Sequence, residues 1–188
     1  EFAEGTKVIP GWCFAYCFNI ENIYFPNSVT TIEDYAFYMC NNKLTRVVLP
    51  DNCTDVGEHA FQECTELQTL VLSESLKYVR SFAFYGCVNL IEVVLPNGIQ
   101  DVQAYAFAEC YKLQRIIVPQ SIQTIGYGAF YGLPELTTLV LPFVGYSRSS
   151  SEGIEALFGY VFGSDTFEYT AADGASQMST YVKDNMAG

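Results

Sequence analysis

The sequence predicts a repeat solenoid, in which one short unit of strand and turn is wound about six times. Phenylalanines recur every 23 residues, with a single step of 24, at Phe14, Phe37, Phe61, Phe84, Phe107 and Phe130. Each is followed by an apolar run of the form L-x-x-I-x-L-P, and four residues after that run comes a second apolar pair. Self-similarity at a fixed period of this length is typical of solenoids. One coil cannot bury its own apolar face, whereas stacked coils bury a continuous core.

The apolar run predicts the first strand of each unit. In the fifth copy it consists of Leu113, Ile116 and Val118, followed by Pro119. Alternation of apolar and other residues indicates a short strand with two side chains turned inward. The proline ends the strand because it has no backbone N–H for the ladder. Since each strand returns in the same direction after a full coil, we expect a parallel sheet along one face.

The rest of each unit closes the coil. The second apolar pair, Ile99 and Val102 in one copy, is expected to face the core from the opposite wall. The following A-F-x-x-C segment is too short for a full helix. It therefore predicts one or two helical or 3-10 turns that bury the phenylalanine. One extra residue lies between Cys40 and Leu44, where we expect a small bulge.

The repeat register is lost after Pro142, so we expect a solenoid over 1–142 and a non-repeat segment over 143–188. Ser149 and Glu152 have the spacing of a capping box. Apolar residues then recur at helical intervals, at Ile154, Leu157, Phe158, Val161 and Phe162. This pattern predicts an amphipathic helix at about 151–162, with mostly irregular chain after it. The segment either caps the exposed core or begins an insertion between blocks of repeats.

Composition excludes several function classes. No window approaches the roughly 18 uninterrupted apolar residues of a membrane span. The chain has 9 Lys and Arg against 21 Asp and Glu, a net charge of -12, which is the wrong sign for nucleic acid or an anionic membrane. The N-terminus has no basic or apolar region of a signal peptide, so either a signal peptide has been removed or the chain begins inside a longer protein. Residues 5–14 already have the pattern of the back half of a repeat, so we expect the chain to begin inside a longer protein.

The consensus V-x-x-I-x-x-x-A-F-x-x-C-x-x-L-x-x-I-x-L-P resembles the BspA-type leucine-rich repeat over about residues 5–142. The resemblance implies a right-handed leucine-rich-repeat solenoid with a sheet on one face. It also implies a secreted or cell-surface bacterial protein that acts in adhesion or protein recognition, with no catalytic residues to carry over. Departures are small: Cys13 replaces Ala, Ser73 replaces Pro, and Leu133 replaces the repeated Cys.

The seven cysteines favour buried free thiols. Five share one repeat position, and the other two replace small or apolar residues at inward positions. Disulfides and a metal site remain alternatives. Stacked coils, however, hold equivalent atoms roughly 5 Å apart with parallel Cβ vectors, whereas a disulfide needs Cβ atoms about 3.8 Å apart and turned toward each other. A linear stack also cannot surround zinc tetrahedrally. We therefore predict no metal ligand and no cofactor.

His59 is the single histidine, and it stands in a column of mostly aromatic residues just before A-F. It is interpreted as one more flat ring in that column. Cys64 lies five residues further on, but its expected burial argues against a reactive thiolate. The sequence contains no phosphate-binding loop, and we find no nucleophile with an adjacent base. We therefore predict that the protein is not an enzyme and has no catalytic residue.

The outward positions of the strands are the candidate binding surface. The middle position forms an apolar ribbon of Tyr24, Val48, Val71, Val94, Ile117 and Val140. Beside it lies a mixed column of Asn22, Arg46, Thr69, Glu92, Arg115 and Thr138. Exposed β-branched residues can reflect strand propensity alone. An apolar stripe rimmed by polar groups is also typical of a protein-binding surface.

We predict a protein-binding site on a concave sheet, made by Tyr24, Arg46, Val48, Val71, Glu92, Val94, Arg115, Ile117 and Val140. The predicted function is a non-enzymatic recognition or adhesion module, with a host surface or matrix protein as the expected class of ligand. We expect no nucleic-acid partner and no membrane insertion. The alternative function is a passive spacer or scaffold domain of a larger surface protein.

Overall fold

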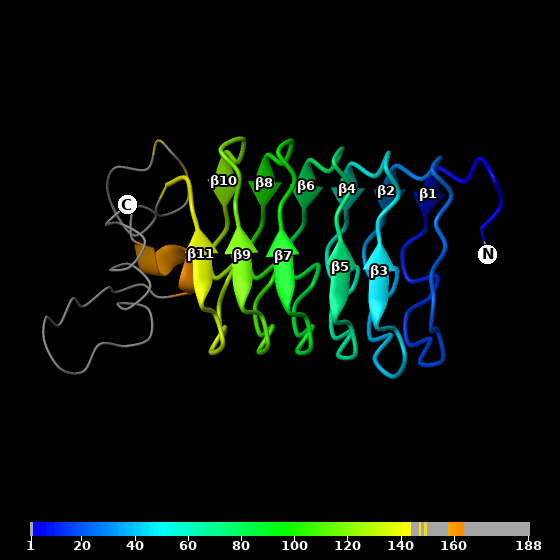
Figure 1. The fold of residues 1–188 in the computed structure, drawn as a ribbon. Coiled ribbons are helices and arrows are strands. Elements are labelled where there is room, and N and C mark those ends of the chain that lie inside the picture. Colours follow the sequence, from blue (N-terminus) through cyan, green and yellow to red (C-terminus); the bar gives the residue numbers. More distant parts are fainter. Residues whose placement is uncertain (1, 144–146, 148, 150–157, 164–188) are drawn as a thin grey trace, which may run out of the picture.

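The computed structural model describes residues 2–143, 147, 149 and 158–163, and it shows a solenoid with three walls (Figure 1). The coils stack side by side along one axis, with the N-terminus at one end. The predicted solenoid of about six 23-residue turns with parallel sheets is confirmed. No helix among the described residues is both long enough and apolar enough to cross a membrane.

The first wall, called the front wall here, faces the viewer in Figure 1. Its strands are β3 (Arg46–Val48), β5 (Thr69–Val71), β7 (Glu92–Val94), β9 (Arg115–Ile117) and β11 (Thr138–Val140). They are parallel and in register, but they form two groups, β3-β5 and β11-β9-β7. The first copy of the repeat, over residues 22–24, forms no strand. Its Asn22 belongs to a residue type that is depleted in strands.

The second wall, called the rear wall, is a continuous parallel sheet of six strands. They are β1 (Val8–Ile9), β2 (Thr31–Ile32), β4 (Asp55–Val56), β6 (Tyr78–Val79), β8 (Asp101–Val102) and β10 (Thr124–Ile125). The sequence placed this apolar pair opposite the first sheet but did not predict a strand there. Each strand is two residues long, so its apolar alternation contains a single inward side chain and gives almost no periodic signal.

The third wall consists of β-turns and replaces the expected helical or 3-10 turns. Successive backbone N–H groups alternate between an acceptor in their own turn and one in the next coil. Ala60 N–H donates to Gly57 O in the same turn (3.3 Å), and Phe61 N–H donates to Ala83 O in the next coil (2.8 Å). Because every second N–H serves the neighbouring coil, the bonds that span three residues stay isolated as turns and no continuous helix forms. Each coil has two residues in left-handed backbone conformation, such as His59 (φ 56) and Glu63 (φ 57). The third residue of a type II turn requires this conformation.

The core runs the length of the stack between the walls. From Phe14 to Phe107, consecutive phenylalanine rings of the repeat are stacked at centroid distances of 5.1 to 5.3 Å. Phe2 packs on the rings of Phe14 and Phe25 at the N-terminal end. The inward strand residues and the second apolar pairs complete one continuous cluster of buried residues.

At the C-terminal end, η2 (Phe158–Phe162) is a 3-10 helix that lies against the last coil. Gly128 N–H donates to Tyr160 O and Phe130 N–H donates to Val161 O, both at 2.9 Å. These bonds take the place of those that a further coil would accept. Val161 and Phe162 are buried. The rest of the predicted helix, 151–157, lies outside the described residues.

Candidate recognition surface on the front wall

The structure places the predicted apolar ribbon on the outer side of the front wall. Tyr24 is 69% exposed and Val94 is 52% exposed, while Val48, Val71 and Val140 are also exposed and Ile117 is half-buried. Their strand neighbours Val47, Val93 and Ile116 are buried. The predicted assignment of inward and outward positions is therefore correct. It follows from the two-residue period of a strand, which sends successive side chains to opposite faces.

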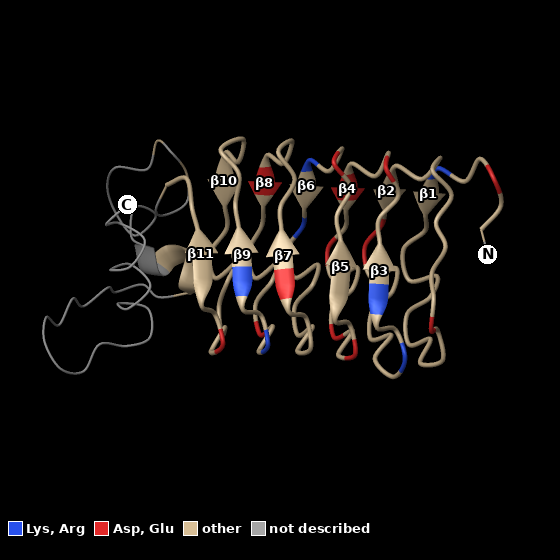
Figure 2. Cartoon of the chain, viewed as in Figure 1, with Lys and Arg blue, Asp and Glu red and all other residues tan. Residues whose placement is uncertain are grey.

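The charged column beside the ribbon is partly neutralised. Arg115 Nε lies 3.0 Å from Glu92 Oε1 on the neighbouring strand, and both side chains are about half exposed. Figure 2 shows the pair as adjacent blue and red bands on β9 and β7. Arg46 lies on β3 opposite Thr69 and makes no ion pair with a described residue. An exposed pair such as Glu92–Arg115 contributes at most about 1 kcal/mol to stability, so both groups can be recruited by a ligand.

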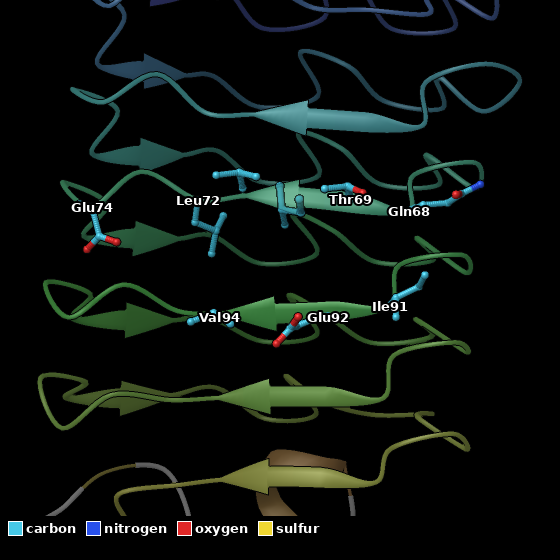
Figure 3. Close-up of a pocket in the computed structure, with 9 residues that line it drawn as sticks. Gln68, Thr69, Leu72, Glu74, Ile91, Glu92 and Val94 are labelled. Atoms are coloured by element: carbon cyan, nitrogen blue, oxygen red, sulfur yellow. The ribbon is translucent and has the colours of Figure 1, made fainter.

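Among the described residues, grooves lie at both places where neighbouring front-wall segments are unpaired. One lies between β5 and β7, has a volume of about 460 Å³, and is lined by Leu70, Leu72, Glu74 and Glu92 among others (Figure 3). The second, of similar volume, lies between the first repeat and β3 and is lined by Tyr24, Arg46 and Val48 among others. Sequence reasoning found the ribbon but neither groove, because both result from how neighbouring coils fail to pair.

The thiols are arranged as predicted at five of the seven positions. Cys40, Cys53, Cys64, Cys87 and Cys110 are buried, whereas Cys13 is exposed and Cys17 is half-buried. The expectation that all seven are buried was wrong for these two. They lie in the first coil, where no preceding described coil covers them.

Four of the buried cysteines donate weak hydrogen bonds to the preceding coil, as from Cys87 Sγ to Phe61 O at 3.3 Å; they are Cys40, Cys64, Cys87 and Cys110. Burial raises the pKa of Cys40 and of Cys110 to about 12. A thiolate is therefore disfavoured at these positions, and with it nucleophilic chemistry. No cluster of three or more His, Cys, Asp or Glu that could hold a metal occurs in the part of the chain that the structure describes.

His59 lies in an aromatic stack, as the sequence predicted. Its ring is parallel to those of Tyr35 and Phe82, at centroid distances of 4.4 and 4.9 Å, and its Nδ1 hydrogen-bonds to Gln62 Oε1. The stack continues to Trp12 on one side and Tyr105 on the other. The imidazole is thus one rung of a structural column on the turn wall.

The model of the BspA type leucine rich repeat region matches residues 40–146, more than half of the chain. The chain belongs to the BspA-type leucine-rich repeat family. Members of this family are generally non-catalytic. No curated protein matches the chain.

Three solved bacterial structures are similar to this member of the family. A leucine-rich repeat protein from Eubacterium ventriosum is 27% identical, with a TM-score of 0.69 and 91% of this chain covered. The leucine-rich repeat protein of T. pallidum is 29% identical, with a TM-score of 0.64 and 69% covered. A leucine-rich cell surface protein from Faecalibacterium prausnitzii is 28% identical, with a TM-score of 0.51 and 74% covered. The chain spans 44%, 60% and 40% of these proteins, respectively.

Proposed function

We propose that this solenoid is the recognition part of a bacterial surface or secreted protein. It binds a protein ligand on its front wall, and this binding serves adhesion. The observation that carries the proposal is the exposure of the ribbon. Five of its six apolar side chains are exposed, from Tyr24 to Val140, and four of these five lie on the paired strands β3, β5, β7 and β11. Monomeric soluble proteins seldom expose contiguous apolar patches larger than a few hundred Å², and larger ones mark interaction sites.

The size of this surface suits a protein ligand. Paired strands lie about 4.8 Å apart, and two of the five steps along the ribbon are unpaired, so roughly 24 Å is a lower bound on its length. Arg46 is an exposed cation beside it, and Tyr24 is an exposed aromatic ring at its end. Arg and aromatic residues usually dominate the affinity of protein interfaces. The net charge of -12 argues against nucleic acid and anionic membranes as partners. We propose no catalytic activity for this domain.

A passive spacer is the second candidate, and the continuity of the rear wall favours it. Six strands pair without a break from β1 to β10, and the phenylalanine stack runs beside them. Such a stack is a stiff rod that could hold another domain away from a surface. In that case the outward valines reflect strand propensity alone.

Binding to an array of purified host matrix and cell-surface proteins separates the two functions. The test variant combines Val48→Asp with Val140→Asp, and the matched control is Val8→Asp, an exposed valine at the start of the rear wall. We expect the double variant to lose at least about tenfold in affinity, since desolvating a carboxylate at an apolar interface is costly. The control should bind normally, and all variants should keep the parent melting temperature. Equal affinity of the double variant, or an array on which nothing binds, would contradict recognition by this wall.

A further inference from the structure

The front wall is open at one junction. In the described repeats, consecutive front-wall strands are closed by the same two backbone bonds at three of the four junctions. At β7–β9, for example, Leu95 N–H donates to Ile117 O (3.1 Å) and Gln114 N–H donates to Ile91 O (2.9 Å). At β5–β7 neither equivalent bond is made, and the two strands belong to different sheets.

The opening is confined to this wall. Behind it, β4 and β6 pair in register, and Arg80 N–H donates to Val56 O at 3.0 Å. On the turn wall of the same two coils, Phe61 N–H donates to Ala83 O at 2.8 Å. The two coils are therefore joined by backbone hydrogen bonds along the rear wall and the turn wall, and they are separated along the front wall. This leaves the groove of about 460 Å³ seen in Figure 3.

The separation partly exposes two side chains whose equivalents in the next coil are covered. Leu70 and Leu72 are only half-buried, whereas the equivalent Val93 and Leu95 are buried. The equivalent bonds elsewhere would here run from Leu72 N–H to Val94 O and from Ile91 N–H to Gln68 O, and neither is made. Two carbonyl acceptors and two N–H donors at the groove therefore lack these partners, and the backbone of an extended ligand segment can pair with the two N–H groups. A partly apolar cleft with unused carbonyl acceptors costs free energy, because each backbone group there can be satisfied only by water or by a ligand.

The charge of the groove is negative. Of its nine lining residues, Glu74 and Glu92 are charged and none is Lys or Arg. Glu74 stands at one end of the groove, is exposed, and makes no ion pair or side-chain hydrogen bond with a described residue (Figure 3). Glu92 is held by Arg115 on the far side. Carboxylates and carbonyl oxygens both accept hydrogen bonds from a cation, so this lining is complementary to an ammonium or guanidinium group.

We propose that the β5–β7 opening holds a lysine or arginine side chain from an extended segment of the protein ligand. The aliphatic part of that side chain lies against Leu70 and Leu72, and its cationic end is bound by Glu74 and the free carbonyl of Val94. Long basic side chains bury their stems on apolar surface while the charged end keeps polar partners. The inference rests on the proposed function of the front wall and names the chemistry that anchors the ligand there.

Three synthetic peptides test the proposal on the whole chain. They share the acetylated and amidated sequence Gly-Thr-Val-Xaa-Val-Thr-Gly, with Xaa as arginine, citrulline or glutamate. Citrulline keeps the shape of arginine without its charge. Titrations followed by ¹H–¹⁵N NMR at low salt should shift the Leu72 and Ile91 amides with the arginine peptide. The citrulline peptide should bind at least about fivefold more weakly, and the glutamate peptide should give no shifts, because charged hydrogen bonds are roughly twice as strong as neutral ones.

Glu74→Gln removes the anchoring charge with little change of shape, and Glu58→Gln is its matched control, an exposed carboxylate on the turn wall. We expect the first to weaken the arginine peptide about fivefold or more and the second to leave it unchanged, with equal melting temperatures. Equal binding of the arginine and citrulline peptides would indicate main-chain strand addition and overturn the proposal. So would an unchanged Glu74→Gln variant, or concentration-dependent dimerisation of the free chain through this groove.

The two proposals fail differently. Val48 and Val140 do not line this groove, so the double aspartate variant tests the wall without touching the anchor. If that variant loses the matrix ligand while the arginine peptide does not shift Leu72 or Ile91, recognition stands and the anchor is wrong. In the opposite outcome, the arginine peptide binds the groove, Glu74→Gln weakens that binding, and the double aspartate variant binds matrix ligands normally. The anchor site is then correct, and the ribbon is not the ligand-binding surface.

Discussion

Thiol reactivity offers a quantitative test of how the coils are packed. We expect a thiol reagent such as Ellman's reagent, at pH 8, to modify Cys13 and Cys17 quickly in the native protein and the five buried cysteines very slowly. Burial raises the Cys110 pKa from 9.0 to about 12. At pH 8 the fraction of thiolate then falls from about one tenth to about one ten-thousandth, a thousandfold reduction before steric exclusion is considered.

The assay compares the release of coloured product in native buffer with that in 8 M urea, where all seven thiols should react. Replacing both Cys13 and Cys17 by Ala should abolish the fast phase and leave five slow groups. Mass spectrometry of the modified peptides would identify the positions. If three or more thiols react as fast in native buffer as in urea, the five cysteines are not buried as described.

The same thiols make stability depend on pH at the alkaline end. A cysteine in the unfolded chain loses its proton near pH 9, whereas the folded chain keeps that of Cys110 until about pH 12. Because the folded pKa is the higher one, the stabilisation is complete below pH 9. It is lost as the pH rises from about 9 toward 12.

Two further predictions concern the core and its C-terminal end. Phe84→Ala removes a ring stacked between Phe61 and Phe107. We expect it to lower the free energy of unfolding, measured by urea titration, by about 3 to 5 kcal/mol. The control Phe18→Ala removes a ring that is 41% exposed and should lower this free energy by less than about 1 kcal/mol. A loss below about 1 kcal/mol at Phe84 would contradict the stacked core. Val161→Asp places a carboxylate where the side chain is fully buried against the last coil. We expect a lower melting temperature and self-association by light scattering, because the end of the core is uncovered; a monomer of unchanged melting temperature would show that η2 is no cap.

Several details could not be predicted from the sequence because they depend on contacts between coils. Left-handed residues are normally recognised by glycine, yet here aromatic and acidic residues such as Trp12, His59 and Glu63 adopt this conformation. Left-handed residues occur at two positions of each coil, and at the first of these positions the side chains are mostly stacked rings, such as those of Trp12 and Tyr35 with centroids 4.1 Å apart. This stacking offsets the free-energy cost of the left-handed backbone at that position. The six rear strands were likewise missed, since two residues are too few for a pattern.

The sequence by itself determined the solenoid, its period and the sidedness of the strands. Each coil has the same surroundings as the next, so its pattern is local and repeats; Val93 inward and Val94 outward follow from position alone. Only the tertiary structure decided where the stack is imperfect. The opening between β5 and β7, the Glu92–Arg115 pair and the exposure of Cys13 arise because each coil meets a particular neighbour or lies at an end. A repeat pattern describes only what the coils share, whereas the candidate binding site is formed where neighbouring coils differ.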